Sequence, residues 1–240
     1  MGKTYNEYIK MEVLSMKKIG MIVAVEIKAV LDKYGSALEE KNVAGYRVLE
    51  YKTPAYELVI LNCGAGEIAA ASGTQYLISE YKVDMIVNFG VVGGLTEDMS
   101  KTKTAVVEKV VHYDFDTSAL DHCEVGRYMQ YPDVFIPVDK ALFDKAREMY
   151  PELKPVICAS ADKFVADPDA KRALNRAYGA EICEMEAAGI ALTCDRNHVP
   201  CLMIKVVSDG ITGGAEEFSQ TIDEAAAICI EIVNEVIGAL

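Results

Sequence analysis

Apolar residues recur along this chain with two different spacings, which alternate from residue 18 onwards. Short, nearly continuous apolar runs predict buried strands, whereas apolar residues at every third or fourth position predict helices that cover a core. The expected strands are residues 19–25, 46–52, 56–62, 85–88, 103–111, 156–159 and 201–207. The expected helices are residues 26–34, 68–81, 139–150, 167–179, 185–194 and 216–240. This alternation predicts an α/β fold: a single domain with a mixed, mostly parallel central sheet flanked by helices.

Two segments depart from the regular alternation. Strands 46–52 and 56–62 follow one another through Thr53-Pro54 and are the one pair that we expect to be antiparallel. Residues 112–138 are polar and aromatic, and we expect them to form a long loop.

Composition narrows the class of protein. A formal net charge of -13 at pH 7 argues against nucleic acid or an anionic membrane as a partner, because both would be repelled. The seven cysteines are scattered without a C-x-x-C pair, which is typical of free thiols in the cytoplasm. The three histidines lack metal-ligand spacing, and no apolar run reaches the length of a membrane span. We therefore expect a cytoplasmic protein that uses no metal or other cofactor and binds small molecules or proteins.

The first residues resemble an addition to the domain. Residues 1–17 lack the hydrophobic core of a signal peptide, and Met16-Lys17-Lys18 resembles a natural start. We expect an N-terminal extension at 1–17, to which we assign no function, followed by one domain at 18–240.

Glu184 and Glu186 stand at the start of the helix expected at 185–194, whose other residues are mostly small or apolar. A helix that is apolar nearly all round is buried, and carboxylates are seldom buried without a partner. Residues two positions apart cannot share a helix face, so at least one glutamate is expected to look inward, toward a ligand or a partner. A carboxylate at a helix start suits two neighbouring hydroxyls, as on a ribose. The alternative is that both glutamates only complement the helix dipole.

Ligands of α/β sheets collect at the carboxyl ends of strands, and two strand ends here are rich in glycine. Gly64-Ala65-Gly66 brings bare backbone amides to a helix start, which favours an anion or hydroxyl site, although Glu67 would repel phosphate. Gly90-Val91-Val92-Gly93-Gly94 is expected to be a tight turn, and its glycines serve either close packing or binding.

Three further residues are candidates for chemistry. Asp209 follows an apolar strand, where burial could raise its pKa and let it move a proton at neutral pH; the alternative is a turn or cap residue. Lys205 lies within the same apolar strand and must reach water or a partner charge. Phe164 follows another expected strand and suits stacking on a base, although a lone phenylalanine more often belongs to a core.

Together these residues resemble the purine nucleoside/uridine phosphorylase superfamily and, within it, the methylthioadenosine/S-adenosylhomocysteine nucleosidases. The similarity extends over essentially residues 18–240. Its most specific elements are Glu184-Met185-Glu186-Ala187 and Val207-Ser208-Asp209, in this order and setting. The remaining elements are Ile19-Gly20-Met21-Ile22-Val23-Ala24-Val25-Glu26, Cys63-Gly64-Ala65-Gly66, Asn88-Phe89-Gly90-Val91-Val92-Gly93-Gly94-Leu95 and the helix that carries Phe218.

The resemblance implies which residues contact a nucleoside. Glu186 would bind the ribose hydroxyls, assisted by the backbone of Met185. Phe164 would stack on adenine, and the backbone of Val165 would read the edge of the purine. The residues implied for the pocket of the 5′-alkylthio group are Val25 and Phe218.

The resemblance also implies the chemistry. Asp209, held by Ser208, would protonate N7 of the base as the glycosidic bond breaks and the ribose gains oxocarbenium character. The nucleosidases carry a glutamate two residues beyond Glu26 that activates the attacking water, but this chain has Lys28 there. Glu26 is near enough to be a substitute base, although its side chain leaves the helix in a different direction.

Other departures decide between the reactions of the superfamily. The serine of the family's glycine segment is Val91 here, and the arginine before its Ser-Asp pair is Lys205. Phosphorylases hold phosphate with arginine and Ser/Thr, so Val91 and Glu67 favour hydrolysis. We expect an N-glycosidic hydrolase that releases adenine from methylthioadenosine, S-adenosylhomocysteine or a related adenosine. The alternatives are a phosphorylase of the same fold and a nucleoside-binding protein that has lost the usual base.

The resemblance further implies a homodimer, because in these nucleosidases the neighbouring subunit completes the alkylthio pocket. The segment 112–138, with Tyr128, Tyr131 and Phe135, looks suited to that contact.

Overall fold

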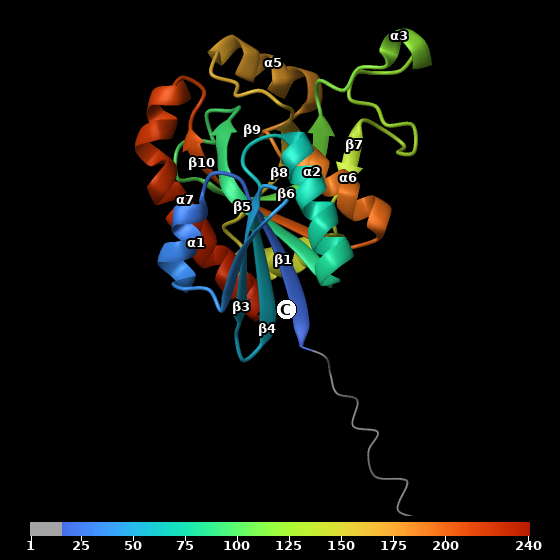
Figure 1. The fold of residues 1–240 in the computed structure, drawn as a ribbon. Coiled ribbons are helices and arrows are strands. Elements are labelled where there is room, and N and C mark those ends of the chain that lie inside the picture. Colours follow the sequence, from blue (N-terminus) through green and yellow to red (C-terminus); the bar gives the residue numbers. More distant parts are fainter. Residues whose placement is uncertain (1–15) are drawn as a thin grey trace, which may run out of the picture.

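A mixed sheet runs through the centre of the molecule, and helices cover both of its faces (Figure 1). The computed structural model describes residues 16–240. The strands are β1 (Lys17–Val23), β2 (Glu39–Val43), β3 (Tyr46–Lys52), β4 (Tyr56–Asn62), β5 (Met85–Gly94), β6 (Thr104–His112), β7 (Phe135–Pro137), β8 (Lys154–Ser160), β9 (Ile182–Glu184) and β10 (Cys201–Asp209). The expected α/β class and the mixed central sheet are confirmed.

Parallel strands form the centre of the sheet. β1 lies between β4 and β5 and is parallel to both, and β10 runs parallel to β5. β8 is parallel to β6 and to β9. Because β10 also pairs with β6, the strands β10, β6, β8, β9 and β5 close into a ring. The carboxyl ends of β1, β5 and β10 therefore meet at one edge, where α/β sheets place their ligand sites.

Antiparallel pairing is more extensive than the sequence pattern predicted. The expected pair, β3 with β4, is present. The expectation that it is the only such pair was wrong, since β2–β3, β5–β9, β6–β7 and β6–β10 are also antiparallel. β2 has the sequence Glu-Glu-Lys-Asn-Val and β7 has three residues, so neither produces the apolar run by which a strand is recognised.

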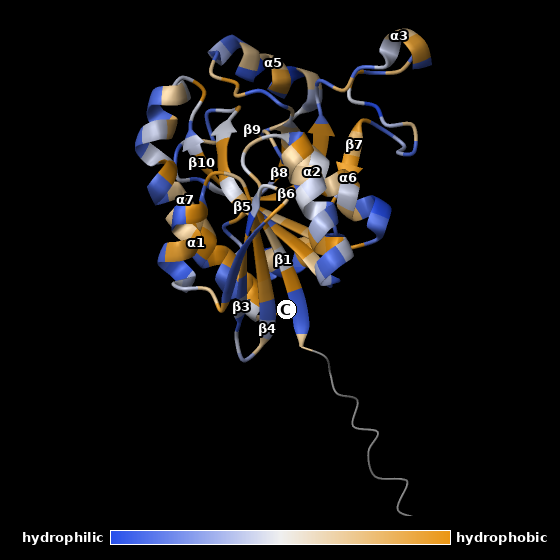
Figure 2. Cartoon of the chain, in the orientation of Figure 1, coloured by the Kyte–Doolittle hydropathy of each residue, from blue (hydrophilic) through white to orange (hydrophobic). Residues whose placement is uncertain are grey.

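The helices form two layers around this sheet. α1 (Ile27–Tyr34), α4 (Lys140–Met149) and α7 (Gly214–Gly238) pack on one apolar cluster. The opposite cluster is covered by α2 (Glu67–Tyr76), its π-helical continuation η1 (Leu77–Tyr81) and α6 (Ala187–Asn197). α5 (Pro168–Tyr178) packs on a third, smaller cluster, and α3 (Ser118–Asp121) is a short helix within the segment expected to be a loop. In Figure 2 the central strands are largely hydrophobic, and helices around them such as α1 and α7 alternate between hydrophilic and hydrophobic residues.

The glycine-rich segment 90–94 is the end of a strand and not the expected tight turn. β5 continues to Gly94 and is buried along its whole length. A Cβ at Gly94 would lie 1.8 Å from the carbonyl oxygen of Met99, so glycine permits a close approach of backbone here. The start of α6 was also misplaced: Glu184 ends the strand β9, and the helix begins at Ala187.

Of the expected extension at 1–17, residues 1–15 lie outside the described part of the chain, and Lys17 begins β1. All seven cysteines are free. Within residues 16–240, no helix combines the length and the apolar character that a membrane span requires.

Candidate active site

A cavity lies at the carboxyl ends of β1, β5 and β10, beside β9. Most of the predicted site residues line it: Val25, Glu26, Val91, Phe164, Glu184, Met185, Glu186, Ser208, Asp209 and Phe218. Val165 lines an adjoining hollow that shares Phe164, Glu184 and Asp209 with the main cavity. Lys205 is buried behind the wall, where its ammonium contacts Glu184. The structure therefore brings the predicted residues together from the strands β1, β5, β8, β9 and β10, or the loops that follow them, and from the helix α7.

Glu26 lies inside the cavity and is held by two backbone amides. Its Oε1 accepts a hydrogen bond from the amide of Val91 at 2.9 Å, and its Oε2 accepts one from the amide of Val25 at 3.0 Å. Only 5% of Glu26 is exposed. A Cβ at Gly90 would stand 2.9 Å from the same Oε1 and 3.7 Å from Nζ of Lys205, so glycine gives both charged groups room at this strand. The carboxylate is thus fixed in direction at the end of β1.

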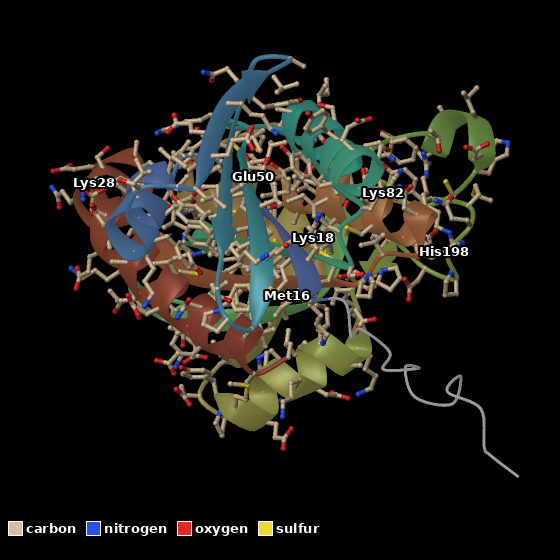
Figure 3. The ribbon with its side chains drawn as sticks, turned by 60° about the horizontal axis from the view of Figure 1, so that its bottom comes forward. Met16, Lys18, Lys28, Glu50, Lys82 and His198 are labelled. Atoms are coloured by element: carbon tan, nitrogen blue, oxygen red, sulfur yellow. The ribbon has the colours of Figure 1, made fainter. Side chains whose placement is uncertain are left out.

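Lys28, which occupies the position of the family's base, points away from this cavity. Its Nζ lies 3.1 Å from a carboxylate oxygen of Asp32 and 3.3 Å from one of Asp223. The Lys28 side chain is 65% exposed, and Figure 3 shows it at the outer edge of the molecule on α1. Of the two candidate positions, the one at Glu26 is therefore the one that faces the cavity.

Glu184 forms a buried ion pair and caps the helix α6. Its carboxylate oxygens accept hydrogen bonds from the amides of Glu186 at 3.1 Å and of Ala187 at 2.9 Å, which uses the positive end of the helix dipole. Nζ of Lys205 lies 3.3 Å from Glu184 Oε2. Burial alone would lower the pKa of Lys205, but the neighbouring carboxylates, Glu184 first, hold it above its usual value. The requirement that Lys205 find a partner charge is confirmed, and the partner is Glu184.

Glu186 is bound by the glycine-rich loop before α2. Its Oε1 accepts a hydrogen bond from the amide of Gly66 at 2.8 Å, so the bare backbone amides expected to receive an anion receive this carboxylate. Gly66 has a φ of 111°, a left-handed backbone conformation that favours glycine. Burial, and next the charge of Glu184, raise the pKa of Glu186 to about 8. The free protein therefore holds a proton on Glu186 at neutral pH.

We call the group Glu26, Glu184, Glu186 and Lys205 the Gly90 end of the cavity. The Gly93 end consists of Lys171, Ser208 and Asp209. Oδ1 of Asp209 accepts a hydrogen bond from the Ser208 hydroxyl at 3.0 Å, and Oδ2 lies 2.5 Å from Nζ of Lys171. A Cβ at Gly93 would stand 3.3 Å from that Nζ and 3.4 Å from that Oδ2.

Asp209 itself is almost inaccessible, with 1% of its surface exposed. Burial raises the pKa of Asp209 above its ordinary value, while the contacts with Lys171 and Ser208 act in the opposite direction. Ser208 and Asp209 belong to β10 and do not follow it, so the alternative of a turn or cap residue does not apply. Asp209 thus has the burial and the partners of a group that exchanges a proton.

Two aromatic rings stand at the mouth of the cavity. The rings of Phe164 and Phe218 meet edge to face, with centroids 5.4 Å apart. Phe164 is 42% exposed and Val25 is 49% exposed, which is unusual for apolar side chains that belong to a core. The interpretation of Phe164 as a core residue is therefore wrong, and its exposed ring is available to a flat, apolar ligand.

Lys171 is the residue of the site that the sequence analysis missed. It comes from α5, where Ala170, Leu174 and Tyr178 pack on the third apolar cluster. A lysine three positions before Leu174 lies on the same side of the helix and is a visible anomaly in the amphipathic pattern. Its partner cannot be read from the pattern, because Asp209 is 38 positions away along the chain.

Comparison with known proteins is consistent with this geometry. The model of the phosphorylase superfamily matches residues 18–238. A 5′-methylthioadenosine/S-adenosylhomocysteine nucleosidase of Shewanella denitrificans is 31% identical over 199 residues, which cover 80% of this chain and 86% of the relative. The Helicobacter pylori protein of the same description, solved as a complex, has a TM-score of 0.88 at 25% identity and covers 94% of this chain and 99% of its own. A structure described as futalosine hydrolase, also from H. pylori, has a TM-score of 0.87 at 25% identity, with 94% and 99% covered.

Proposed function

The chain belongs to the phosphorylase superfamily, and we propose that it is a nucleosidase that releases adenine from methylthioadenosine, S-adenosylhomocysteine or a related adenosine nucleoside. It hydrolyses the N-glycosidic bond. The observation that carries this proposal is the convergence of Glu26, Glu186 and Asp209 in one cavity whose mouth bears two phenylalanine rings. In this set Glu26 would activate the water, Glu186 would bind the ribose and Asp209 would protonate the leaving base.

Asp209 is the proposed general acid. In the transition state the bond between C1′ and N9 breaks, its electron pair moves to the base, and the ribose becomes positively charged. A proton delivered to N7 neutralises the charge that develops on the leaving purine. Ser208 donates a hydrogen bond to Oδ1 of Asp209 and so holds the carboxyl group in a fixed orientation.

Glu186 is the proposed ribose ligand. A carboxylate accepts hydrogen bonds from two neighbouring hydroxyls, and such charge-assisted bonds are among the strongest that a neutral sugar can make. Its present partner, the amide of Gly66, occupies only Oε1. The negative charge also favours the oxocarbenium character of the ribose.

Glu26 is the proposed base for the attacking water. Its two amide bonds fix the carboxylate against the wall, while its second lone pairs remain free to accept a proton. Lys28 takes no part, because it pairs with Asp32 and Asp223 outside the cavity.

The charges of the cavity support hydrolysis over phosphorolysis. Among the described residues that line the main cavity there is no lysine or arginine. The buried ammonium groups of Lys171 and Lys205 are each bound to a carboxylate. Phosphate would therefore meet Glu26 and Glu186 without a free cation to hold it, which is unfavourable.

The deciding experiment measures adenine release in the presence and absence of phosphate. The substrates are methylthioadenosine, S-adenosylhomocysteine and adenosine, which release adenine, together with inosine and futalosine, for which the release of hypoxanthine is measured instead. Release from the thio-nucleosides without phosphate is the expected result. Strict dependence on phosphate would establish a phosphorylase, and binding without turnover would establish a nucleoside-binding protein.

Three further proposals concern the setting of the site. We propose a homodimer formed through the segment 112–138, where Leu120 is 82% exposed and Met129 is 63% exposed. Light scattering that shows a monomer at micromolar concentration would contradict it.

The cysteines, all free, support a cytoplasmic location. The division into an extension at 1–17 and a domain at 18–240 remains a prediction.

A further inference from the structure

A fully buried lysine is in direct contact with the proposed general acid. Nζ of Lys171 lies 2.5 Å from Oδ2 of Asp209 and donates a second hydrogen bond to the carbonyl oxygen of Gly210 at 2.7 Å. The side chains of Lys171 and Asp209 are 0% and 1% exposed. Lysine is among the residues least often buried completely, so a lysine in this place requires a specific reason.

The contact conflicts with the task of a simple acid. A carboxyl group that protonates a base must carry a proton before the bond breaks. An ammonium group on Oδ2 favours the ionised carboxylate, and an ionised Asp209 has no proton to give. Either the pair opens, or the ammonium group supplies the proton through Asp209.

The geometry favours the second course. Lys171 projects from α5, and Gly93 leaves just enough room for its ammonium group. The hydrogen bond to the Gly210 carbonyl fixes the ammonium on its far side. Oδ1 of Asp209 is held by Ser208, so both partners are immobilised in contact.

We propose that Lys171 is a positioning residue that stores the proton which Asp209 passes to the leaving base. This inference rests on the proposed function, since it concerns the acid of that reaction. The pair holds one transferable proton, either as ammonium and carboxylate or as amine and carboxylic acid. Because both side chains are enclosed and in direct contact, that proton stays within the pair until the base takes it.

The C1′–N9 bond breaks with its electron pair on the base, N7 takes the proton of Asp209, and Asp209 takes one from Lys171. The oxygen of water bonds to C1′, and the proton that this water loses goes to Glu26. Glu26 returns a proton to solvent and Lys171 takes one up, so the enzyme is restored and one water molecule is consumed.

Other groups near the pair also affect its titration. Ser208 donates to Asp209, and Glu217 of α7 raises its pKa through its negative charge. Cys183 of β9 lies beside the ammonium of Lys171, and burial raises the pKa of its thiol to about 12. Cys183 therefore stays neutral over the range of the experiment, which leaves Lys171, Asp209 and Glu217 as the charged groups at this position.

The test compares the pH profiles of Lys171→Met and Lys171→Arg with that of the wild type. Met removes the second store of the proton, so Asp209 alone must hold it, and a buried carboxylic acid is protonated more fully at acid pH than at pH 8. We expect kcat of Lys171→Met to fall by about 10²-fold or more near pH 8 and to recover to within about tenfold of wild type near pH 5.5. Arg keeps the positive charge but cannot give up a proton, so kcat should be low at both pH values with KM little changed.

The opposite pattern would overturn the proposal. If Lys171 only holds Asp209 in place, Lys171→Arg retains kcat near pH 8 and Lys171→Met loses the same factor at every pH. Circular dichroism checks that each variant folds. If Lys171→Met does not fold, Lys171→Arg decides alone: a low kcat with an unchanged KM supports the proton store, and a retained kcat contradicts it. A wild-type protein that releases no base would instead refute the proposed function, and the proton store with it, so the two failures are distinguishable.

Discussion

At the Gly90 end of the cavity three carboxylates surround one lysine, whereas at the Gly93 end one lysine faces one carboxylate. Both ends are built beside a glycine of β5 whose missing side chain leaves room for a buried ammonium group. At the Gly90 end, Lys205 contacts Glu184 while Glu26 and Glu186 lie nearby, and the pKa of Glu186 rises to about 8. At the Gly93 end, Lys171 and Asp209 neutralise each other.

The difference in charge balance separates two tasks that one reaction requires. A ribose that turns cationic is stabilised by an excess of carboxylates. A departing base needs a proton, and the lysine–carboxylate pair carries one; after the transfer the pair bears a single negative charge until Lys171 takes up a proton again. The fold therefore places a buried lysine beside a glycine of β5 at both ends, and the two ends differ in the number of carboxylates around that lysine.

The largest effect is expected at the Gly93 end. Asp209→Asn keeps the shape of the side chain but cannot deliver a proton, so kcat should fall by about 10²–10⁴-fold with a smaller change in KM. Steady-state kinetics with methylthioadenosine measure this loss. A substrate whose base leaves well without protonation should be affected much less, and a variant with near wild-type kcat would place the acid elsewhere.

The second-largest effect is expected for Glu26, the proposed general base at the Gly90 end. Glu26→Gln should lower kcat by about 10²-fold, because the amide cannot accept the proton of the attacking water. Lys28→Gln is the matched control two positions away, and its kcat should stay within about twofold of wild type. If the control loses activity and Glu26→Gln keeps it, the base has been assigned to the wrong residue.

Glu186→Gln should have a more moderate effect, expressed in both binding and turnover. A charge-assisted hydrogen bond contributes about 1.5–3 kcal/mol, so kcat/KM should fall by at least about tenfold. A 2′-deoxy nucleoside already lacks one of the hydroxyls and should lose less. Unchanged kinetics with the full ribose would mean that Glu186 only complements the start of α6.

The smallest expected effect is the release of one proton from Glu186 when a substrate analogue binds. Because the pKa of Glu186 is raised to about 8, the free protein holds that proton near neutral pH, and ribose hydroxyls should lower the pKa by favouring the carboxylate. Binding of a substrate analogue near pH 6.5 should therefore release up to about one proton, and binding above about pH 9 should release almost none. Calorimetry in buffers of different ionisation enthalpy measures the number, and Glu186→Gln should abolish the release.

The sequence was informative where a residue contradicted its own surroundings. A lysine inside an apolar strand had to reach water or a partner charge, and Lys205 contacts Glu184. An aspartate close after two valines was expected to be either a buried acid or a turn or cap residue, and Asp209 is buried. These conflicts are local, so they are visible without knowledge of the fold.

What the sequence could not provide was the distance between segments. The pattern around the glycines Gly90 and Gly93 predicts a turn. Their function is to leave room for side chains from β10, β9, α5 and the loop after β1, and the sequence does not show that these segments meet there. Lys171 resembled a minor irregularity of an amphipathic helix until the fold placed it on Asp209. The direction of Glu26 likewise depends on the amide of Val91, which belongs to a different strand.

The position of β10 has a consequence for how the protein is made. This strand forms hydrogen bonds to β5 on one side and to β6 on the other, and it is the last strand of the chain. During synthesis, the edges of β5 and β6 that pair with β10 remain unpaired until residues 201–209 have left the ribosome. Unpaired hydrophobic strand edges can pair with other chains and cause aggregation. A chain that stops before Cys201 should therefore aggregate rather than persist as a smaller folded protein. The same insertion brings Asp209 to the site, so no shortened product can acquire the acid without completing the sheet.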